Sequence, residues 1–229
     1  MKKQRVFYTE LCYLLGLIVM AFGAAFSERA GFGMSMVVAP AYILHLKISA
    51  FLPWFTFGVA EYLVQGLLVL VLALVMRRFK LSYLFSFVTA LLYGAALDGA
   101  IWVLSFLPHD VMVLRILYFA LGTVLCSVAV SLFLRTYISP EAYELIVKEF
   151  TKKFSFDVAR FKTVYDCIST LVSVALSFAF FGLGVFRGVG VGTVVCALVN
   201  GFLIGKISAW LGKTFTFKNR FAIEKYFEM

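Results

Sequence analysis

Six ionisable side chains interrupt the most apolar stretches of this 229-residue chain, and their chemistry points most directly to function. They are Glu10, Glu61, Asp98, Arg115, Asp166 and Lys206. An ionised group at the centre of a lipid bilayer costs at least about 2.5 kcal/mol, so such groups are rare without a function. Acids in this setting can bind a cation, or can bind and release a proton. The sequence therefore predicts a polar pathway inside a membrane-embedded fold.

The depths of these side chains predict two groups of charges. At a rise of about 1.5 Å per residue, an outer group lies about 6 to 12 Å below one end of its spans, and it consists of Glu61, Asp98 and Arg115. An inner group lies at corresponding depths from the other end, and it consists of Asp166, Lys206 and Glu10. We expect these groups to line or gate a central pathway. The alternative is that Lys206 snorkels to the interface, that Asp166 and Glu10 lie at helix ends, and that the rest form static salt bridges.

Six apolar stretches provide the elements that position these charges, and each has the roughly 20 residues needed to cross about 30 Å of hydrocarbon. They lie near 7–26, 54–76, 82–106, 111–134, 163–185 and 190–211. With 63% hydrophobic and 14% charged residues, the chain has more apolar surface than a soluble core could bury. We expect a single all-α membrane domain over residues 1–229. The alternative for the first stretch is a cleaved signal peptide, since MKKQR precedes it.

The sequence indicates an internal repeat of three apolar spans. FGVAEYL (57–63) aligns with KTVYDCI (162–168), which places Glu61 on Asp166 at an offset of 105. VTALLYG (88–94) aligns with VCALVNG (195–201) at an offset of 107. Because three is odd, the second copy must cross the membrane in the opposite sense, as in many secondary transporters. We expect inverted repeats over about 7–106 and about 111–211, and the alternative is chance similarity of apolar helices.

Glycines recur at every fourth position over residues 184–192, and again at positions 201 and 205. This small-xxx-small spacing predicts close packing between helix backbones. The alternative is a loosened start of the last span, which would expose backbone N–H groups to a ligand. Tyr93 and Asn200 are aligned across the two copies, each one residue before a glycine. We expect them to offer hydrogen bonds to a substrate.

Two segments between the spans have distinct patterns. Residues 31–50 are apolar, but Gly31, Gly33 and Pro40 interrupt them, so we expect a re-entrant or interfacial half-helix after the first span. Residues 139–158 separate apolar from charged positions at helical spacing, which predicts an amphipathic cytoplasmic helix lying along the membrane surface. A plain cytoplasmic linker helix is the alternative for that second segment.

The net charge of +9 is best explained by membrane topology. With a cytoplasmic amino terminus and six spans, most of the 21 Lys and Arg residues, Lys162 among them, fall on the cytoplasmic side. We therefore expect both termini in the cytoplasm and no nucleic-acid partner.

GTVVCALVNG (192–201), ALLYGAALD (90–98) and the acids early in the second and fifth spans resemble the YczE/YitT-like family of bacterial integral membrane proteins. In that family each half has a Ser-Pro-x-Asp-like start to a short helix. Here the second half has SPEA (139–142), whereas the first has SMVV (35–38), without the proline and the acid. The resemblance implies a six-span protein of the bacterial plasma membrane and leaves the substrate open.

The sequence favours transport over catalysis. It lacks HExxH and GxSxG motifs, and His45 and His109 are the only histidines, so we expect no enzyme, catalytic residue, metal or cofactor. The four cysteines have neither metal-site nor disulfide spacing. We expect a protein in the lipid bilayer that moves a small solute by alternating access, with proton coupling as one form. The alternatives are a substrate-capture subunit with a partner complex and a nontransporting accessory or scaffold protein. The protein partner we expect is a second copy in a homodimer, or a partner subunit.

Overall fold

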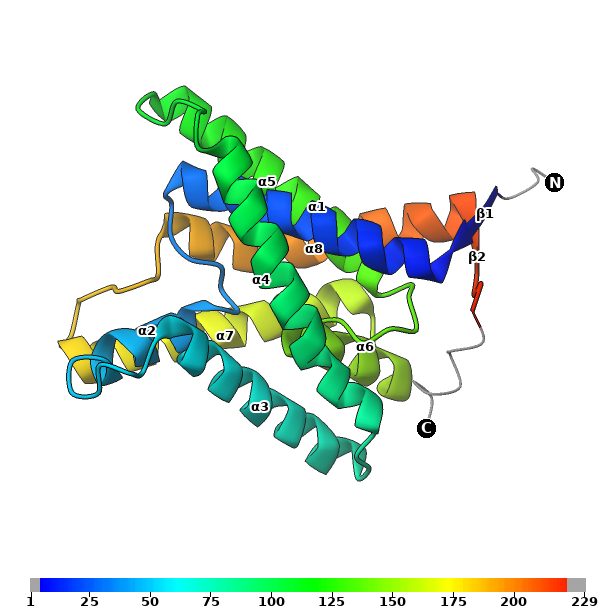
Figure 1. Cartoon of the computed structure of the whole chain (residues 1–229), viewed down its shortest axis with the longest axis horizontal. Coiled ribbons are helices and arrows are strands. Elements are labelled where there is room, and N and C mark those ends of the chain that lie inside the picture. The colour runs from blue at the N-terminus through cyan, green and yellow to red at the C-terminus, as the bar shows by residue number, and fades with distance from the viewer. Residues whose placement is uncertain (1–4, 222–229) are drawn as a thin grey trace.

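The computed structural model describes residues 5–221, which form eight α-helices and two short strands (Figure 1). The helices of the first half are α1 (Thr9–Ala30), α2 (Ala39–Ile48), α3 (Phe57–Met76) and α4 (Phe85–Leu104). Those of the second half are α5 (Met112–Phe133), α6 (Ala142–Phe154), α7 (Val158–Phe181) and α8 (Val191–Thr214). Each half therefore has the order long, short, long, long.

Six of the helices in residues 5–221 are long and apolar enough to span a membrane, and they are α1, α3, α4, α5, α7 and α8. The 3-10 turn Leu81–Leu84 extends the third of these spans at its start. The predicted all-α membrane protein with six spans is thus confirmed. The largest difference at the start of a span is in α7, which begins at Val158 and not near residue 163. This shift places Lys162 within a span.

The two helices that carry the aligned acids begin at side-chain caps. Thr56 Oγ1 accepts a hydrogen bond from the Val59 N–H at 3.4 Å and caps α3, which begins at Phe57, before Glu61. Asp157 Oδ1 accepts one from the Arg160 N–H at 2.9 Å and caps α7, which begins at Val158, before Asp166. Such caps satisfy N–H groups that have no partner inside the helix.

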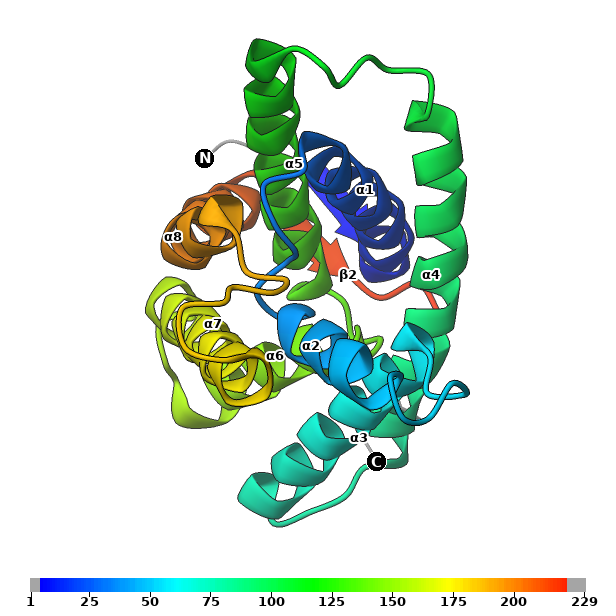
Figure 2. The same cartoon turned by 90° about the vertical axis from the view of Figure 1, so that its left-hand side faces the viewer.

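The centre of the bundle is the antiparallel pair α1 and α5, which glycines bring close together. A Cβ atom at Gly23 would lie 2.8 Å from Cys126 Sγ, and one at Gly122 would lie 2.7 Å from the Gly23 carbonyl oxygen. Helix α4 packs on the other side of α1, and α8 packs on α5 (Figure 2). Close backbone approach of this kind is a main source of helix association in membranes.

Both short helices lie between α3 and α7 and begin near the middle of the bundle (Figures 1 and 2). Residues 31–38 run inward from one end, and α2 returns to that end, so this segment is re-entrant. Residues 134–141 and α6 do the same from the opposite end. The expected helix over 139–158 is present, but its expected position along the surface was wrong for its first half, because Ala142 to Val147 are all buried.

The outer helix pairs of the two halves differ in packing. Helices α7 and α8 lie side by side, and a Cβ atom at Gly201 would overlap Thr163 Oγ1 and lie 2.5 Å from the Ala159 carbonyl oxygen. Helices α3 and α4 instead diverge from the turn that joins them (Figure 1). Their contact includes the rings of Tyr62 and Phe87, whose centroids are 6.1 Å apart.

The ends of the described chain meet in a parallel pair of strands that the sequence did not predict. Strand β1 (Arg5–Tyr8) pairs with β2 (Phe215–Lys218), with Arg5 opposite Phe215. Both strands therefore lie at one end of the bundle (Figure 1).

Replacing Gly201 with Ala is expected to lower the free energy of unfolding by about 1 to 3 kcal/mol, because the added methyl group overlaps α7. The matched variant is Gly94→Ala on α4, where a Cβ atom meets no atom of residues 5–221 within 4 Å. That variant should keep or slightly raise stability. Thermal unfolding of both proteins in the same detergent measures the difference, and equal losses would contradict the described packing of α7 on α8.

Candidate functional site

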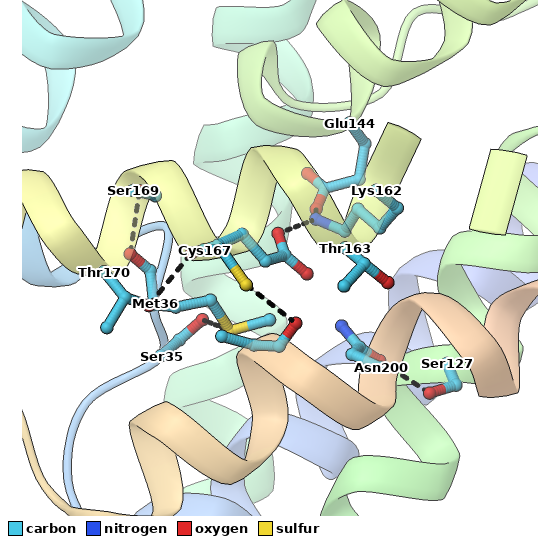
Figure 3. Close-up of polar contacts among 12 residues, drawn as sticks. Ser35, Met36, Ser127, Glu144, Lys162, Thr163, Cys167, Ser169, Thr170 and Asn200 are labelled. Carbon is cyan, nitrogen blue, oxygen red and sulfur yellow. Dashed lines mark hydrogen bonds and ion pairs between the residues drawn. The ribbon is translucent and has the colours of Figure 1, made fainter. Parts of the chain in front are cut away.

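A central polar cluster lies where α3, α6, α7 and α8 meet, and we define it as Glu61, Gln65, Tyr143, Glu144, Lys162, Asp166 and Asn200. Its strongest interaction is an ion pair within α7. The Lys162 Nζ atom lies 2.8 Å from Asp166 Oδ1, and the two side chains are 1% and 0% exposed (Figure 3). Their i,i+4 spacing places both on one face of the helix. A pair buried this completely requires further polar partners to offset its desolvation.

The further partner comes from the first turn of α6. Glu144 Oε1 lies 3.8 Å from Lys162 Nζ, and its side chain is 6% exposed, so one ammonium group faces two carboxylates (Figure 3). Burial raises the pKa of the Glu144 carboxyl, and the Lys162 ammonium partly opposes this shift. The re-entrant position of α6 is what delivers Glu144 to α7.

The neighbouring residue of α6 contacts the acid of the other half. The Tyr143 hydroxyl donates a hydrogen bond to Glu61 Oε1 at 2.9 Å. Gln65, which is 1% exposed, lies one turn further along α3 and faces the same carboxylate. Glu61 and Asp166 are thus connected through the consecutive residues Tyr143 and Glu144 of α6, with Lys162 between Glu144 and Asp166.

On the side of α8, an amide completes the cluster. Asn200 is buried, its Oδ1 accepts a hydrogen bond from the Ser127 hydroxyl of α5 at 2.6 Å, and it neighbours the Asp166 carboxylate (Figure 3). The tip of the first re-entrant segment also reaches this region. The Ser169 hydroxyl of α7 donates to the Met36 carbonyl oxygen at 2.9 Å, and Met36 packs against Tyr143.

Several acceptor atoms of the cluster have no donor. Glu61 Oε2, Gln65 Oε1 and Asp166 Oδ2 are buried and accept no hydrogen bond from residues 5–221. A buried polar atom without a partner costs about 1 to 3 kcal/mol, and more when it is charged. All three are oxygens, so the missing groups are hydrogen-bond donors, protons or a cation.

The charge balance of the region is acidic. Glu141, at the start of α6, is within electrostatic reach of Glu144 and Glu61. Burial and these carboxylates raise the pKa of the Glu141 carboxyl well above its usual range. The region therefore holds four acids, of which Asp166 and Glu144 contact the Lys162 ammonium, and this excess of acid favours uptake of positive charge or of protons. Among residues 5–221, no group of three or more His, Cys, Asp or Glu side chains is arranged to hold a metal ion.

Five of the eight residues predicted from the sequence lie outside this cluster, and two of these five are exposed on helix surfaces. Asp98 is exposed on α4. Lys206 is exposed on α8, where its Nζ atom lies 4.4 Å from the centroid of the Phe202 ring. The outer and inner groups are therefore not two separate clusters of side chains, because Glu61 and Asp166 belong to one.

Arg115 and Glu10 bind backbone groups at opposite ends of the bundle. Arg115 Nε donates to the Ala30 carbonyl oxygen at 2.7 Å, which satisfies the end of α1. Glu10 accepts hydrogen bonds from the Arg220 and Phe221 N–H groups, at 2.9 and 3.0 Å, and from the Tyr137 hydroxyl at 3.1 Å. Both side chains thus tie the chain at helix ends.

Tyr93 lies near the central cluster without a hydrogen bond to it. Its ring packs in the interface of α4 with α1, where Ala21, Ala25 and Ala100 are buried, and it is within electrostatic reach of Glu141. Lys162, Glu144 and Tyr143 were not predicted as site residues, because their segments were expected on the cytoplasmic side. The i,i+4 spacing of Lys162 and Asp166 was the available signal.

Residues 7–209 match the model of a family of unknown function, DUF6198. The chain belongs to this family. The match includes every residue of the central polar cluster and five complete spans. No curated protein and no solved structure matches the chain.

Replacing Lys162 with Met is expected to lower the free energy of unfolding by about 3 to 5 kcal/mol, because Asp166 and Glu144 lose the one cationic partner that residues 5–221 give them. The double variant Lys162→Met, Asp166→Asn removes one of these stranded charges and should recover part of the loss. Thermal unfolding in detergent measures both. A single variant as stable as the natural protein would show that the ion pair does not hold the site together.

Proposed function

We propose that this multi-pass membrane protein is a transporter whose central polar cluster binds a small cationic solute or a proton. The observation that carries the proposal is the set of buried oxygens without donors, on Glu61, Gln65 and Asp166. A purely structural cluster would satisfy such atoms internally, since each unsatisfied one is costly in an apolar interior. A transport site must instead leave them free for a ligand that comes and goes.

The composition of the site supports a positively charged or proton-coupled solute. Acids outnumber the one lysine, and the raised pKa of Glu141 and of Glu144 makes these carboxyls ready proton acceptors. Asn200 and Tyr143 supply neutral hydrogen-bonding groups beside the acids. Such groups set orientation in small-molecule sites.

Alternating access is supported by the correspondence between the halves. We take α1–α4 and α5–α8 as inverted repeats. Exchange of the halves turns the contact of α1 with α4 into that of α5 with α8, and the contact of α2 with α7 into that of α6 with α3. One pair breaks the correspondence, because α7 packs on α8 while α3 and α4 diverge. In inverted-repeat transporters, movement of one repeat against the other opens the site to one side of the membrane and closes it to the other. In the opposite conformation α3 would pack on α4, and α7 would separate from α8.

Two glycines of the first half fit this exchange. In the second half Gly201 packs on Thr163, and the aligned positions of the first half are Gly94 and Gly58. Gly94 lies two turns from Phe87, so it is on the face of α4 that meets α3. Nothing in residues 5–221 lies within 4 Å of a Cβ atom placed there. The small size of Gly94 is not required by the packing in this conformation. It would allow α3 to pack on α4 in the conformation that opens to the other side of the membrane.

The purified chain in liposomes is expected to take up a solute from a panel of small amines and inorganic cations when a proton gradient is imposed. Glu61→Gln should abolish this uptake, because it removes the acid that Tyr143 presents to the site. Asp98→Asn is the matched control, since it neutralises an embedded acid on the exposed face of α4 and should leave uptake unchanged.

Uptake by the purified chain would also exclude the two alternatives, a capture subunit that needs a partner complex and a nontransporting scaffold. The transport proposal fails if the Glu61→Gln protein transports at the natural rate. It fails equally if no solute of the panel and no proton, followed with an entrapped pH dye, crosses the membrane.

Replacing Gly94 with Leu is expected to reduce uptake more than about tenfold while leaving thermal stability unchanged, because the side chain fits the present conformation and prevents α3 from closing on α4. Gly99→Leu makes the same change on another, exposed face of α4 and should transport normally. Normal uptake by the Gly94→Leu protein would contradict the proposed closure.

The wider setting follows from the sequence. We place the protein in the bacterial plasma membrane with both termini in the cytoplasm, on the distribution of Lys and Arg, and we place it near the YczE/YitT-like proteins on the motifs of residues 90–98 and 192–201.

A further inference from the structure

A second polar region is a cavity of about 540 Å³ beside the second half of α6. It lies towards the end of the bundle that carries the two strands. Its cationic lining residues are Lys80, Arg135, Lys148 and Lys152, and its one acid is Glu149. Four positive side chains against one negative give the lining a net charge of +3. The basic cavity, as we call it, is thus opposite in sign to the central polar cluster.

Within residues 5–221, no ion pair neutralises the four cationic side chains of the basic cavity. Both ion pairs found in residues 5–221 belong to Lys162. Lys148 Nζ donates to the Ile138 carbonyl oxygen at 3.0 Å, and Arg135 Nη2 donates to the Ser208 carbonyl oxygen at 2.8 Å. These carbonyl groups satisfy one donor each and carry no net charge.

The acid of the cavity is itself engaged. The Tyr83 hydroxyl donates a hydrogen bond to Glu149 Oε2 at 3.1 Å. Burial is the largest cause that lowers the pKa of the Lys148 ammonium to about 8, with Lys152 and Lys80 acting in the same direction and Glu149 opposing them. Positive charges are therefore held close together at an energetic cost, which a bound anion would relieve.

We infer that the basic cavity is a binding site for a phosphate-bearing anion. Its volume is within the range of about 300 to 1,000 Å³ typical of small-ligand pockets. Lysine and arginine are the side chains that recognise phosphate oxygens, and the hydroxyls of Thr136 and Ser139 line the same cavity. Basic residues on the cytoplasmic side also set the orientation of a membrane protein. That role does not require the basic side chains to line one cavity.

Two sources can supply such a phosphate group, a soluble phosphate compound and the headgroup of an anionic lipid. The aromatic residues near the cavity, Phe156 in its lining and Phe154 on α6, are exposed, so a lipid chain could lie against them while its headgroup enters. The shared chemistry is a phosphate ester or phosphate ion held by several cationic side chains. The two sources are separable by experiment.

The test uses the full chain purified in a neutral detergent and titrated calorimetrically with two probes, inorganic phosphate and short-chain dihexanoyl phosphatidylglycerol. Lys152→Gln is expected to weaken binding of the accepted probe about tenfold, because it removes a charge-assisted hydrogen bond. Lys153→Gln is the matched control. It makes the same change at the next residue of α6, whose Nζ atom donates to the Val75 carbonyl oxygen outside the cavity, and should weaken binding less than about twofold.

Lys148→Gln should weaken binding at least as much as Lys152→Gln, and its thermal unfolding curve shows whether the fold is kept. Binding of inorganic phosphate with these losses supports a soluble ligand, and binding of phosphatidylglycerol alone supports a lipid headgroup. The inference is overturned if neither probe binds, if dihexanoyl phosphatidylcholine binds as tightly as phosphatidylglycerol, or if Lys152→Gln and Lys153→Gln weaken binding equally.

Discussion

The Lys162 ammonium group lies between the carboxylates of Asp166 and Glu144, deep in an otherwise apolar bundle. The ion pair of Lys162 with Asp166 on α7 alone would lack a further polar partner to offset its desolvation, which costs several kcal/mol per ion. Sharing the ammonium with Glu144 draws the first half of α6 into the interior, and Tyr143 follows because it is the adjacent residue. The hydrogen bond from Tyr143 to Glu61 then connects the two halves of the chain. The re-entrant course of α6 thus depends on one buried lysine. The same lysine gathers the acids of α6 and α7 at the centre.

Around this centre, the fold combines a tightly packed part with a looser one. Glycines hold α1 against α5 and α8 against α7 at distances that leave no room for a side chain. Helices α3 and α4 lack such contacts along most of their length. Packed interiors deform little, so relative motion is expected where the packing is already incomplete. The acid that the loose part carries, Glu61, therefore sits where a movement would change its surroundings most.

Hydropathy was enough to predict six spans, because about 20 apolar residues in a row have few other uses. It also singled out Glu61 and Asp166, since an acid within such a run is conspicuous. The partners of these acids were not predictable in the same way. Glu144 and Lys162 lie in segments of mixed charge, where an amphipathic pattern shows which residues share a face but not what that face meets. Glu10 similarly binds N–H groups 210 residues away, and only the folded chain brings them together.

The 13 residues of α6 contact two chemically different surroundings. Its first turn contributes Tyr143 and Glu144 to the acidic centre. Its later turns contribute Lys148 and Lys152 to the basic cavity, at the end of the bundle that carries the strands. A rigid helix of this length cannot tilt at one end without displacing the other. A displacement of α6 at the basic cavity would therefore also move the acidic centre, because fewer than four helical turns of one helix join them.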